Sequence, residues 1–146
     1  MNYFDQINSH EYIYLGGIEE GLNNTLRIVI RETGVNLEAQ AASVGDLTLS
    51  AQGIESTVDS HAYEIYFDSY IGYSVIDESY AAPSDSEIFA GKIYCIYEKS
   101  AYLDYLFNAS CACEDYPGRF KHYGFNCLNH VIDIASTDEP TIKMLS

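Results

Sequence analysis

Polar and apolar residues alternate along at least four segments of this sequence, whereas helical spacing is convincing in one segment only. Alternation with a period of two residues is typical of β-strands that bury one face. Parallel βαβ units would require helices between successive strands, and the sequence offers one clear helical connection. The pattern therefore predicts a mainly antiparallel β protein with one principal helix, its sheet curled or folded into a sandwich or barrel. The predicted strands are residues 25–31, 63–79, 92–98, 122–127 and 131–135.

The helical segment begins at Ser100, a favourable N-cap residue because its hydroxyl can accept a backbone N–H of the first turn. Apolar residues then recur three and four positions apart, at Tyr102, Leu103, Leu106 and Phe107. This spacing predicts an amphipathic helix over about residues 100–110 that covers one face or one opening of the sheet.

The remaining segments have weaker patterns. Residues 11–15 fit either a short strand or a helical turn, 46–50 and 53–57 fit short strands, and 80–91 fit a loop. The 63–79 segment is longer than a typical flat strand, so Gly72 is expected to mark a bulge or bend within it. Pro140 is expected to end the ordered part of the chain.

The chain has 146 residues, the size of one ordinary domain, and residues 1–146 are expected to form a single domain. Its first residues lack the basic and apolar regions of a signal peptide. No stretch approaches the roughly 18 consecutive apolar residues of a membrane helix. We therefore expect a cytoplasmic protein without membrane association, whose four cysteines are thiols rather than disulfides.

The net charge of −15 limits the classes of partner. Nucleic acids and anionic membrane surfaces would repel such a chain, so neither is an expected partner. A basic protein would be attracted to it. Most of the charge is on residues 1–90, which carry 15 acidic and 2 basic side chains. The sequence thus favours an acidic face that binds a basic protein partner.

Acidic residues and tyrosines alternate on one side of the long 63–79 segment. If Ile65, Phe67, Ile71, Tyr73 and Val75 point into the core, the residues of opposite parity point outward. Tyrosine offers contact area at low entropic cost and stacks on arginine, and carboxylates pair with Lys and Arg. The alternative is that this row packs under the helix or a second sheet, with Tyr66 and Tyr70 in the core. The predicted partner-binding residues are Glu64, Tyr66, Asp68, Tyr70, Glu78 and Tyr80, with Asp77, Asp85 and Glu87 of the following acidic loop.

Two alternative hypotheses assign a metal site or a catalytic site to the cysteine- and histidine-containing region. Cys111, Cys113, Cys127 and His130 have ligand types suited to zinc, although the Cys-x-Cys spacing is tighter than a usual zinc knuckle. Cys127 with His122 or His130 has the composition of a cysteine hydrolase, which composition alone does not establish. The same residues are also explained as buried thiols and a histidine within a strand, which have neither a metal-binding nor a catalytic role. The sequence therefore predicts neither a bound metal nor a cofactor.

Three stretches carry a resemblance to known proteins: residues 66–79 (YFDSYIGYSVIDES), 100–105 (SAYLDY) and 122–133 (HYGFNCLNHVID). Across about residues 25–142, the chain resembles a family of small bacterial proteins to which no enzyme activity can be attached. Their size and acidity are similar to those of immunity proteins from contact-dependent inhibition and other polymorphic toxin systems. The resemblance implies a non-enzymatic protein that occludes a toxin domain, often a basic nuclease, and it assigns no individual residue. A small cysteine- or metal-dependent hydrolase and a non-catalytic β structural or ligand-binding module remain the alternatives.

Overall fold

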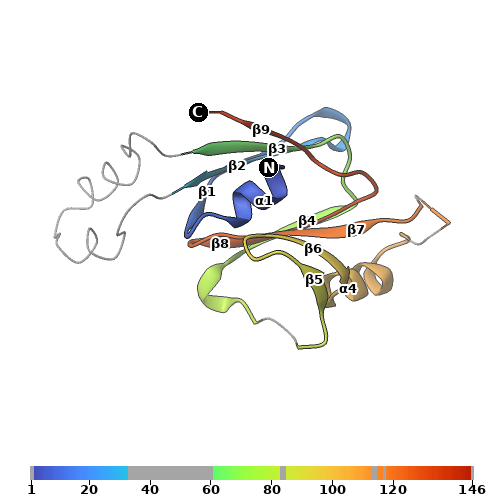
Figure 1. The fold of residues 1–146 in the computed structure, drawn as a ribbon. Helices are drawn as coiled ribbons and strands as arrows, with labels where there is room; N and C mark the ends of the chain where they lie inside the picture. The colour runs from blue at the N-terminus through green and yellow to red at the C-terminus, as the bar shows by residue number, and fades with distance from the viewer. Residues whose placement is uncertain (1, 33–60, 83–84, 113–114, 117, 146) are drawn as a thin grey trace.

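The structure is a computed structural model that describes residues 2–32, 61–82, 85–112, 115–116 and 118–145. Its strands form two antiparallel sheets that lie one above the other (Figure 1). The first sheet has the order β1-β2-β3-β9, with β1 (Ile13–Glu20), β2 (Leu26–Glu32), β3 (Ala62–Phe67) and β9 (Thr141–Met144). The second sheet has the order β4-β8-β7-β6-β5, with β4 (Gly72–Asp77), β5 (Ile88–Ala90), β6 (Tyr94–Lys99), β7 (Lys121–Asn126) and β8 (His130–Ser136). Two α-helices, α1 (Tyr3–Asn8) and α4 (Ala101–Ala109), and two short 3-10 helices, η1 (Leu22–Asn24) and η2 (Glu78–Tyr80), complete the described elements.

The main core lies between the two sheets. Alternate residues of β2 and β3 point toward it from the first sheet, and alternate residues of β7 and β8 from the second. Each such Ile or Phe side chain stabilises the fold by roughly 1.5–3 kcal/mol relative to its exposed state. The described strands pair only within their own sheet, so the fold is an open sandwich rather than a closed barrel. The buried residues that face one another are Ile28, Ile30, Ile65 and Phe67 with Tyr123, Phe125, Ile132 and Ile134.

The predicted strand over residues 63–79 is two strands in the structure. β3 belongs to the first sheet and β4 to the second, and the chain crosses between them in residues 68–71. Ile65 and Phe67 are buried as expected, but Val75 is 37% exposed, so its predicted place in the core is wrong. The reason is that β4 is an edge strand of the second sheet and has a neighbouring strand on one side only.

Helix α4 covers part of the outer face of the second sheet (Figure 1). It begins directly after Ser100, whose hydroxyl accepts the backbone N–H of Leu103 at 3.1 Å. Leu103 and Leu106 pack against Phe120 and Ala135 in a second, smaller core. The predicted helix over residues 100–110 is confirmed, and the second sheet is covered on both faces along part of its length.

The first residues of the chain hold the two sheets together. The Asn8 carboxamide oxygen accepts the backbone N–H groups of Lys92, Ile93 and Tyr94 at 3.0, 2.7 and 2.9 Å. Its amide nitrogen donates to the Tyr94 carbonyl at 3.0 Å. Helix α1 is thereby fixed to the start of β6 in the second sheet, while the chain leaving it enters β1 of the first sheet. The weak periodicity of residues 1–24 did not predict this helix.

Other differences from the sequence predictions concern short elements. The region predicted as a short strand or helical turn at 11–15 is the start of β1. β5 lies within the predicted loop over residues 80–91. The prediction that order ends at Pro140 is wrong, because β9 follows and pairs with β3. The predicted strands over 46–50 and 53–57 lie outside the described residues. Within the described part of the chain, no helix is long and apolar enough to span a membrane.

Candidate functional site

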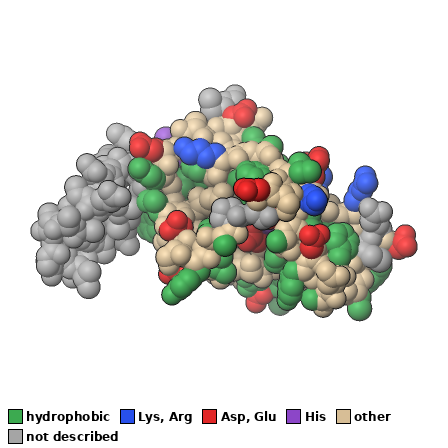
Figure 2. Space-filling model, turned by 90° about the horizontal axis from the view of Figure 1, so that it is seen from below, with side chains coloured by type: hydrophobic (Ala, Val, Ile, Leu, Met, Phe, Trp, Pro, Cys, Tyr) green, Lys and Arg blue, Asp and Glu red, His purple; other side chains and the backbone are tan. Residues whose placement is uncertain are grey.

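A pocket of about 490 Å³ opens on the outer face of the second sheet, beside α4. Figure 2 looks onto the side of the molecule that carries α4 and β5, where apolar and acidic side chains lie next to one another. The pocket is open because α4 covers only part of this face. The side chains that matter most for its chemistry are Phe89, Tyr97, Tyr102, His122 and Asp133, with Glu78 and Glu87.

Strand alternation places three of these side chains in the pocket. Tyr97 on β6 and His122 on β7 are partners in the strand register, and their rings stack with centroids 4.0 Å apart. Asp133 on β8 is the register partner of Gly124. A Cβ atom at Gly124 would lie 2.9 Å from the Tyr97 ring and 3.5 Å from an Asp133 carboxylate oxygen. The missing side chain at this position therefore lets the Tyr97 ring lie flat on the sheet.

His122 has a hydrogen-bond partner at each ring nitrogen. Its Nδ1 lies 2.8 Å from the Ser100 hydroxyl, and its Nε2 lies 2.6 Å from Asp133 Oδ1. The Ser100 oxygen already accepts from Leu103, so its own hydrogen can be donated to Nδ1, and Nε2–H then donates to Asp133. Ser100 is 1% exposed, and no substrate can reach its hydroxyl. This Ser–His–Asp chain therefore fixes α4 and the pocket floor, and does not form a nucleophilic site.

The pocket combines neutral aromatic rings with carboxylates. Burial, followed by nearby negative groups that include Asp133, raises the pKa of Tyr97 and of Tyr102, so both phenols stay protonated at neutral pH. Phe89 packs on Tyr97 with ring centroids 4.9 Å apart. Among the described residues that line the pocket, none is Lys or Arg. Aromatic faces beside unneutralised carboxylates suit a cationic group.

Several of the predicted partner-binding residues lie at or near this pocket. Glu78 and Glu87 line it, and Glu87 also accepts the Ala101 backbone N–H at 3.0 Å at the start of α4. Asp77 binds the backbone and hydroxyl of Ser79, and these hydrogen bonds lower the pKa of Asp77. Tyr80 is 79% exposed, and Asp85 is exposed as well.

The other predicted partner-binding residues lie elsewhere and do not form one row with Glu78 and Tyr80. Glu64 and Tyr66 are on β3 in the first sheet, and Asp68 is exposed in the crossing between sheets. Glu64 is paired with Arg27 at 2.6 Å and Lys143 at 3.5 Å. The Tyr70 hydroxyl donates to Glu20 at 2.6 Å, and this bond is the main reason that the pKa of Tyr70 rises to about 12. The expected row of side chains is therefore divided, because β3 and β4 belong to different sheets.

Of the residues in the two chemical alternatives, Cys127 and His122 line the same pocket, but both ring nitrogens of His122 are bonded to Ser100 and Asp133. Cys127 is buried, and burial raises its pKa to about 12, which opposes thiolate chemistry at neutral pH. Cys111 is exposed just beyond α4, and His130 is partly buried at the start of β8. Cys113 lies outside the described residues.

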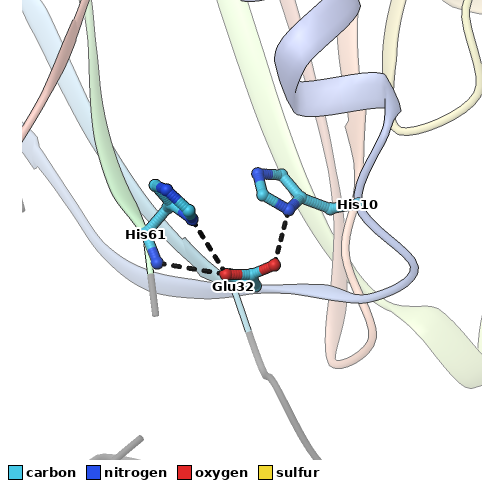
Figure 3. Close-up of side chains that lie close together, drawn as sticks. All are labelled: His10, Glu32 and His61. Atoms are coloured by element: carbon cyan, nitrogen blue, oxygen red, sulfur yellow. Dashed lines mark hydrogen bonds and ion pairs between the residues drawn. The ribbon is translucent and has the colours of Figure 1, made fainter. Parts of the chain in front are cut away.

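A second cluster of titratable side chains, His10, Glu32 and His61, lies at one end of the first sheet (Figure 3). His10 Nδ1 lies 2.7 Å from Glu32 Oε2, and His61 Nδ1 lies 3.0 Å from Glu32 Oε1. These residues were not predicted as a site, because they are not close to one another in the sequence. They come from three separate segments that sheet pairing brings together.

Comparisons of the chain with protein-family models, with curated proteins and with solved structures find no match. Function is therefore inferred from the geometry of the pocket. Among the described residues that line the pocket, Cys127 is a buried thiol with a raised pKa, and the phenols of Tyr97 and Tyr102 are protonated. The aromatic walls and carboxylates of the pocket can hold a cation from solution.

Proposed function

We propose that this protein is a non-enzymatic binding protein that receives an arginine side chain of a basic protein partner in the pocket beside α4. The observation that carries this proposal is the set of aromatic rings Phe89, Tyr97 and Tyr102 lining one pocket with Glu78, Glu87 and Asp133. A guanidinium can stack on an aromatic face and donate hydrogen bonds from its edge to carboxylates at the same time. The pocket, rather than the predicted row of acidic residues and tyrosines on the 63–79 segment, is then the main contact surface.

The choice of arginine follows from the shape of the lining groups. Phe89 and Tyr97 pack together, and Tyr97 stacks on His122, so the pocket offers broad aromatic faces. Guanidinium is planar and more weakly hydrated than ammonium, so it loses less on leaving water for such a site. A cation held over an aromatic ring contributes about 0.5–2 kcal/mol, depending on how far it is desolvated.

The net charge supports the same class of partner. A chain with a charge of −15 attracts a basic protein over long range and repels nucleic acid. We therefore propose the role of an immunity protein, which binds a basic toxin domain, such as a nuclease, in the cytoplasm and occludes its active site. Occlusion needs a large contact surface, and the exposed rings of Tyr80 and of Phe89, which lines the pocket, offer apolar area for it.

A direct test uses a defined probe rather than an unknown partner. N-acetyl-arginine methylamide, added to isotopically labelled protein, is expected to shift the NMR signals of Tyr97, Tyr102 and His122. N-acetyl-lysine methylamide should cause smaller shifts at equal concentration, and the neutral citrulline analogue should cause none. Equal shifts with citrulline would contradict a site for cations.

The immunity role itself needs a toxin assay. If a toxin-domain gene lies beside the gene for this protein, the two purified proteins should form a complex that abolishes the toxin's activity. The Phe89→Ala variant should neutralise less well, whereas Asp68→Asn should neutralise as well as the wild type. Full neutralisation by Phe89→Ala would place the interface outside the pocket.

A further inference from the structure

We propose that His10, Glu32 and His61 form a binding site for one divalent transition-metal ion, with Zn²⁺ as the representative ion. The three residues present two imidazole nitrogens and one carboxylate, and one ligand atom from each lies within 4.8 Å of the others. This inference is independent of the arginine pocket. It also replaces the expectation of a metal-free protein, which rested on the cysteine-containing region alone.

The backbone of the first sheet determines where the three residues lie (Figure 3). Glu32 is the last residue of β2, and its backbone N–H donates to the His61 carbonyl at 2.7 Å. The Ile13 end of β1 pairs with Glu32, which brings His10, three residues before Ile13, to the same place. The cluster therefore depends on strand pairing and not on an exposed loop.

The separation of the ligand atoms fits a metal ion after a small movement. Zinc binds imidazole nitrogen and carboxylate oxygen at about 2.0–2.2 Å, which places tetrahedral ligand atoms about 3.4 Å apart. The two nitrogen–oxygen distances of 2.7 and 3.0 Å have to increase by less than about 1 Å to reach that value. His61 is able to make this movement, because 41% of its side chain is exposed.

His10 is held in the orientation that a metal ligand needs. Its Nε2 lies 2.6 Å from the hydroxyl of Tyr63, which is fully buried. When Nε2–H donates to Tyr63, the lone pair of Nδ1 is directed at Glu32. A metal-bound histidine commonly donates its other ring N–H to a neighbouring acceptor in this manner. Tyr63 is therefore a positioning residue for the proposed ion.

The charge and type of the ligands favour one class of metal. Burial raises the pKa of Glu32, but hydrogen bonds from His61 and the neighbouring His10 outweigh burial, so the net shift is downward. Glu32 is thus an ionised ligand at neutral pH. Imidazole ligands suit Zn²⁺, Co²⁺, Ni²⁺ and Fe²⁺, whereas Mg²⁺ and Ca²⁺ prefer sites made of oxygen atoms. Three protein ligands leave a further coordination position for water or another ligand.

The test measures metal binding to the full chain after treatment with a chelator. Isothermal titration with Zn²⁺ is expected to give one site per chain, and Mg²⁺ at the same concentration is expected to give none. His61→Ala and Glu32→Gln should weaken Zn²⁺ binding by more than about 100-fold, since loss of a ligand exceeds the 10- to 100-fold effect of losing an outer partner. Tyr63→Phe should weaken it by about 10- to 100-fold. His130→Asn, which removes a histidine outside the cluster, is the matched control and should bind as the wild type does.

The absorption spectrum of bound Co²⁺ distinguishes the site of His10, Glu32 and His61 from a site formed by cysteines. Bound Co²⁺ should give visible absorption bands without the near-ultraviolet charge-transfer band of a thiolate ligand. A chain with Cys111 and Cys113 both replaced by serine should bind Zn²⁺ with unchanged affinity. Absence of a stoichiometric site, or equal affinity in His61→Ala and the wild type, would overturn the proposal. Circular dichroism of each variant confirms that a loss of binding is not a loss of fold.

Discussion

Tyr97 and His122 stack face to face, with ring centroids 4.0 Å apart and an interplanar angle of 8°. The two residues are opposite one another on neighbouring strands, and both point away from the main core. His122 is only 2% exposed because Tyr97 covers one side of its ring and Tyr102 lies 5.1 Å away on α4. This contact therefore connects the second sheet, helix α4 and the pocket. A substitution in any of the three should alter the structure of the other two.

Replacing Ser100 with alanine is expected to destabilise the fold by about 2 kcal/mol. The hydroxyl caps α4 and also bonds to buried His122, and loss of a cap and of a buried partner each costs roughly 1 kcal/mol or more. Urea denaturation of the two proteins measures this difference. Ser79→Ala, at an exposed hydroxyl that bonds to Asp77, is the control and should change stability by less than about 0.5 kcal/mol. Equal effects of the two substitutions would contradict the structural role of Ser100.

Gly124→Ala should destabilise the protein by about 1–3 kcal/mol, because the added methyl group would displace the Tyr97 ring. Gly17→Ala is the matched control in another strand, where a Cβ atom meets nothing within 4 Å. That change should be neutral or slightly stabilising. The near-ultraviolet circular dichroism of tyrosine should change in the first variant only. An unperturbed spectrum in Gly124→Ala would argue against the stacked arrangement.

Association with a basic partner should slow as salt concentration rises, because steering by the negative chain is screened over roughly 8 Å at physiological ionic strength. Glu78→Gln should mainly reduce the association rate. Phe89→Ala should mainly increase the dissociation rate and cost about 2 kcal/mol, because the Phe89 ring lines the proposed arginine pocket. Surface plasmon resonance at several salt concentrations separates the two rates. Asp68→Asn removes the same charge at a residue that does not line the pocket, so an association rate equal to that of Glu78→Gln would indicate a purely long-range effect.

The ion pair of Glu64 should stabilise the fold in a pH-dependent way. The hydrogen bond from Arg27, with a smaller contribution from Lys143, lowers the pKa of Glu64 below its ordinary value of 4.5. The stabilisation is therefore complete above about pH 4.5 and is lost as the pH falls through the lower pKa of the folded state. The difference in unfolding free energy between the wild type and Glu64→Gln should accordingly shrink toward acidic pH. A difference that stays constant from pH 7 to pH 3 would show that the charge of Glu64 is not responsible.

Thiol labelling should distinguish the cysteines sharply. Cys111 is exposed and should react with iodoacetamide at neutral pH. Burial raises the pKa of Cys95 to about 11 and that of Cys127 to about 12, so both should react only when the fold opens. Peptide mass spectrometry of the labelled native protein identifies the sites. Rapid labelling of Cys127 would revive the cysteine hydrolase alternative.

The sequence was sufficient to predict β2, β6, β7, β8 and the principal helix, because their signals are local. Alternation in β2, β7 and β8 and the cap at Ser100 each depend on residues within about ten positions of one another. A bulge or bend at Gly72 was predicted, and the crossing lies just before it at residues 68–71, but the change of sheet was not predictable because alternation continues across it with the same parity. Val75 was assigned to the core because alternation does not reveal that β4 is an edge strand.

The candidate site was predictable only in part. The acidic residues Glu78 and Glu87 were identified from charge, and they do line the pocket. The aromatic walls were not identified, because Tyr97 and Tyr102 meet only when α4 folds onto the second sheet. His10 and His61 are 51 positions apart and share Glu32 through strand pairing, which no local pattern records.

The contact of Asn8 with the start of β6 has a consequence for synthesis on the ribosome. Its hydrogen bonds span 84 to 86 residues of the chain. The first helix is made early, but the residues that bond to Asn8 leave the exit tunnel only after more than half of the chain has been translated. Non-local contacts of this kind form late and slow the folding of β proteins. The nascent amino-terminal segment therefore cannot form its contacts with β6 until that part of the second sheet has left the ribosome.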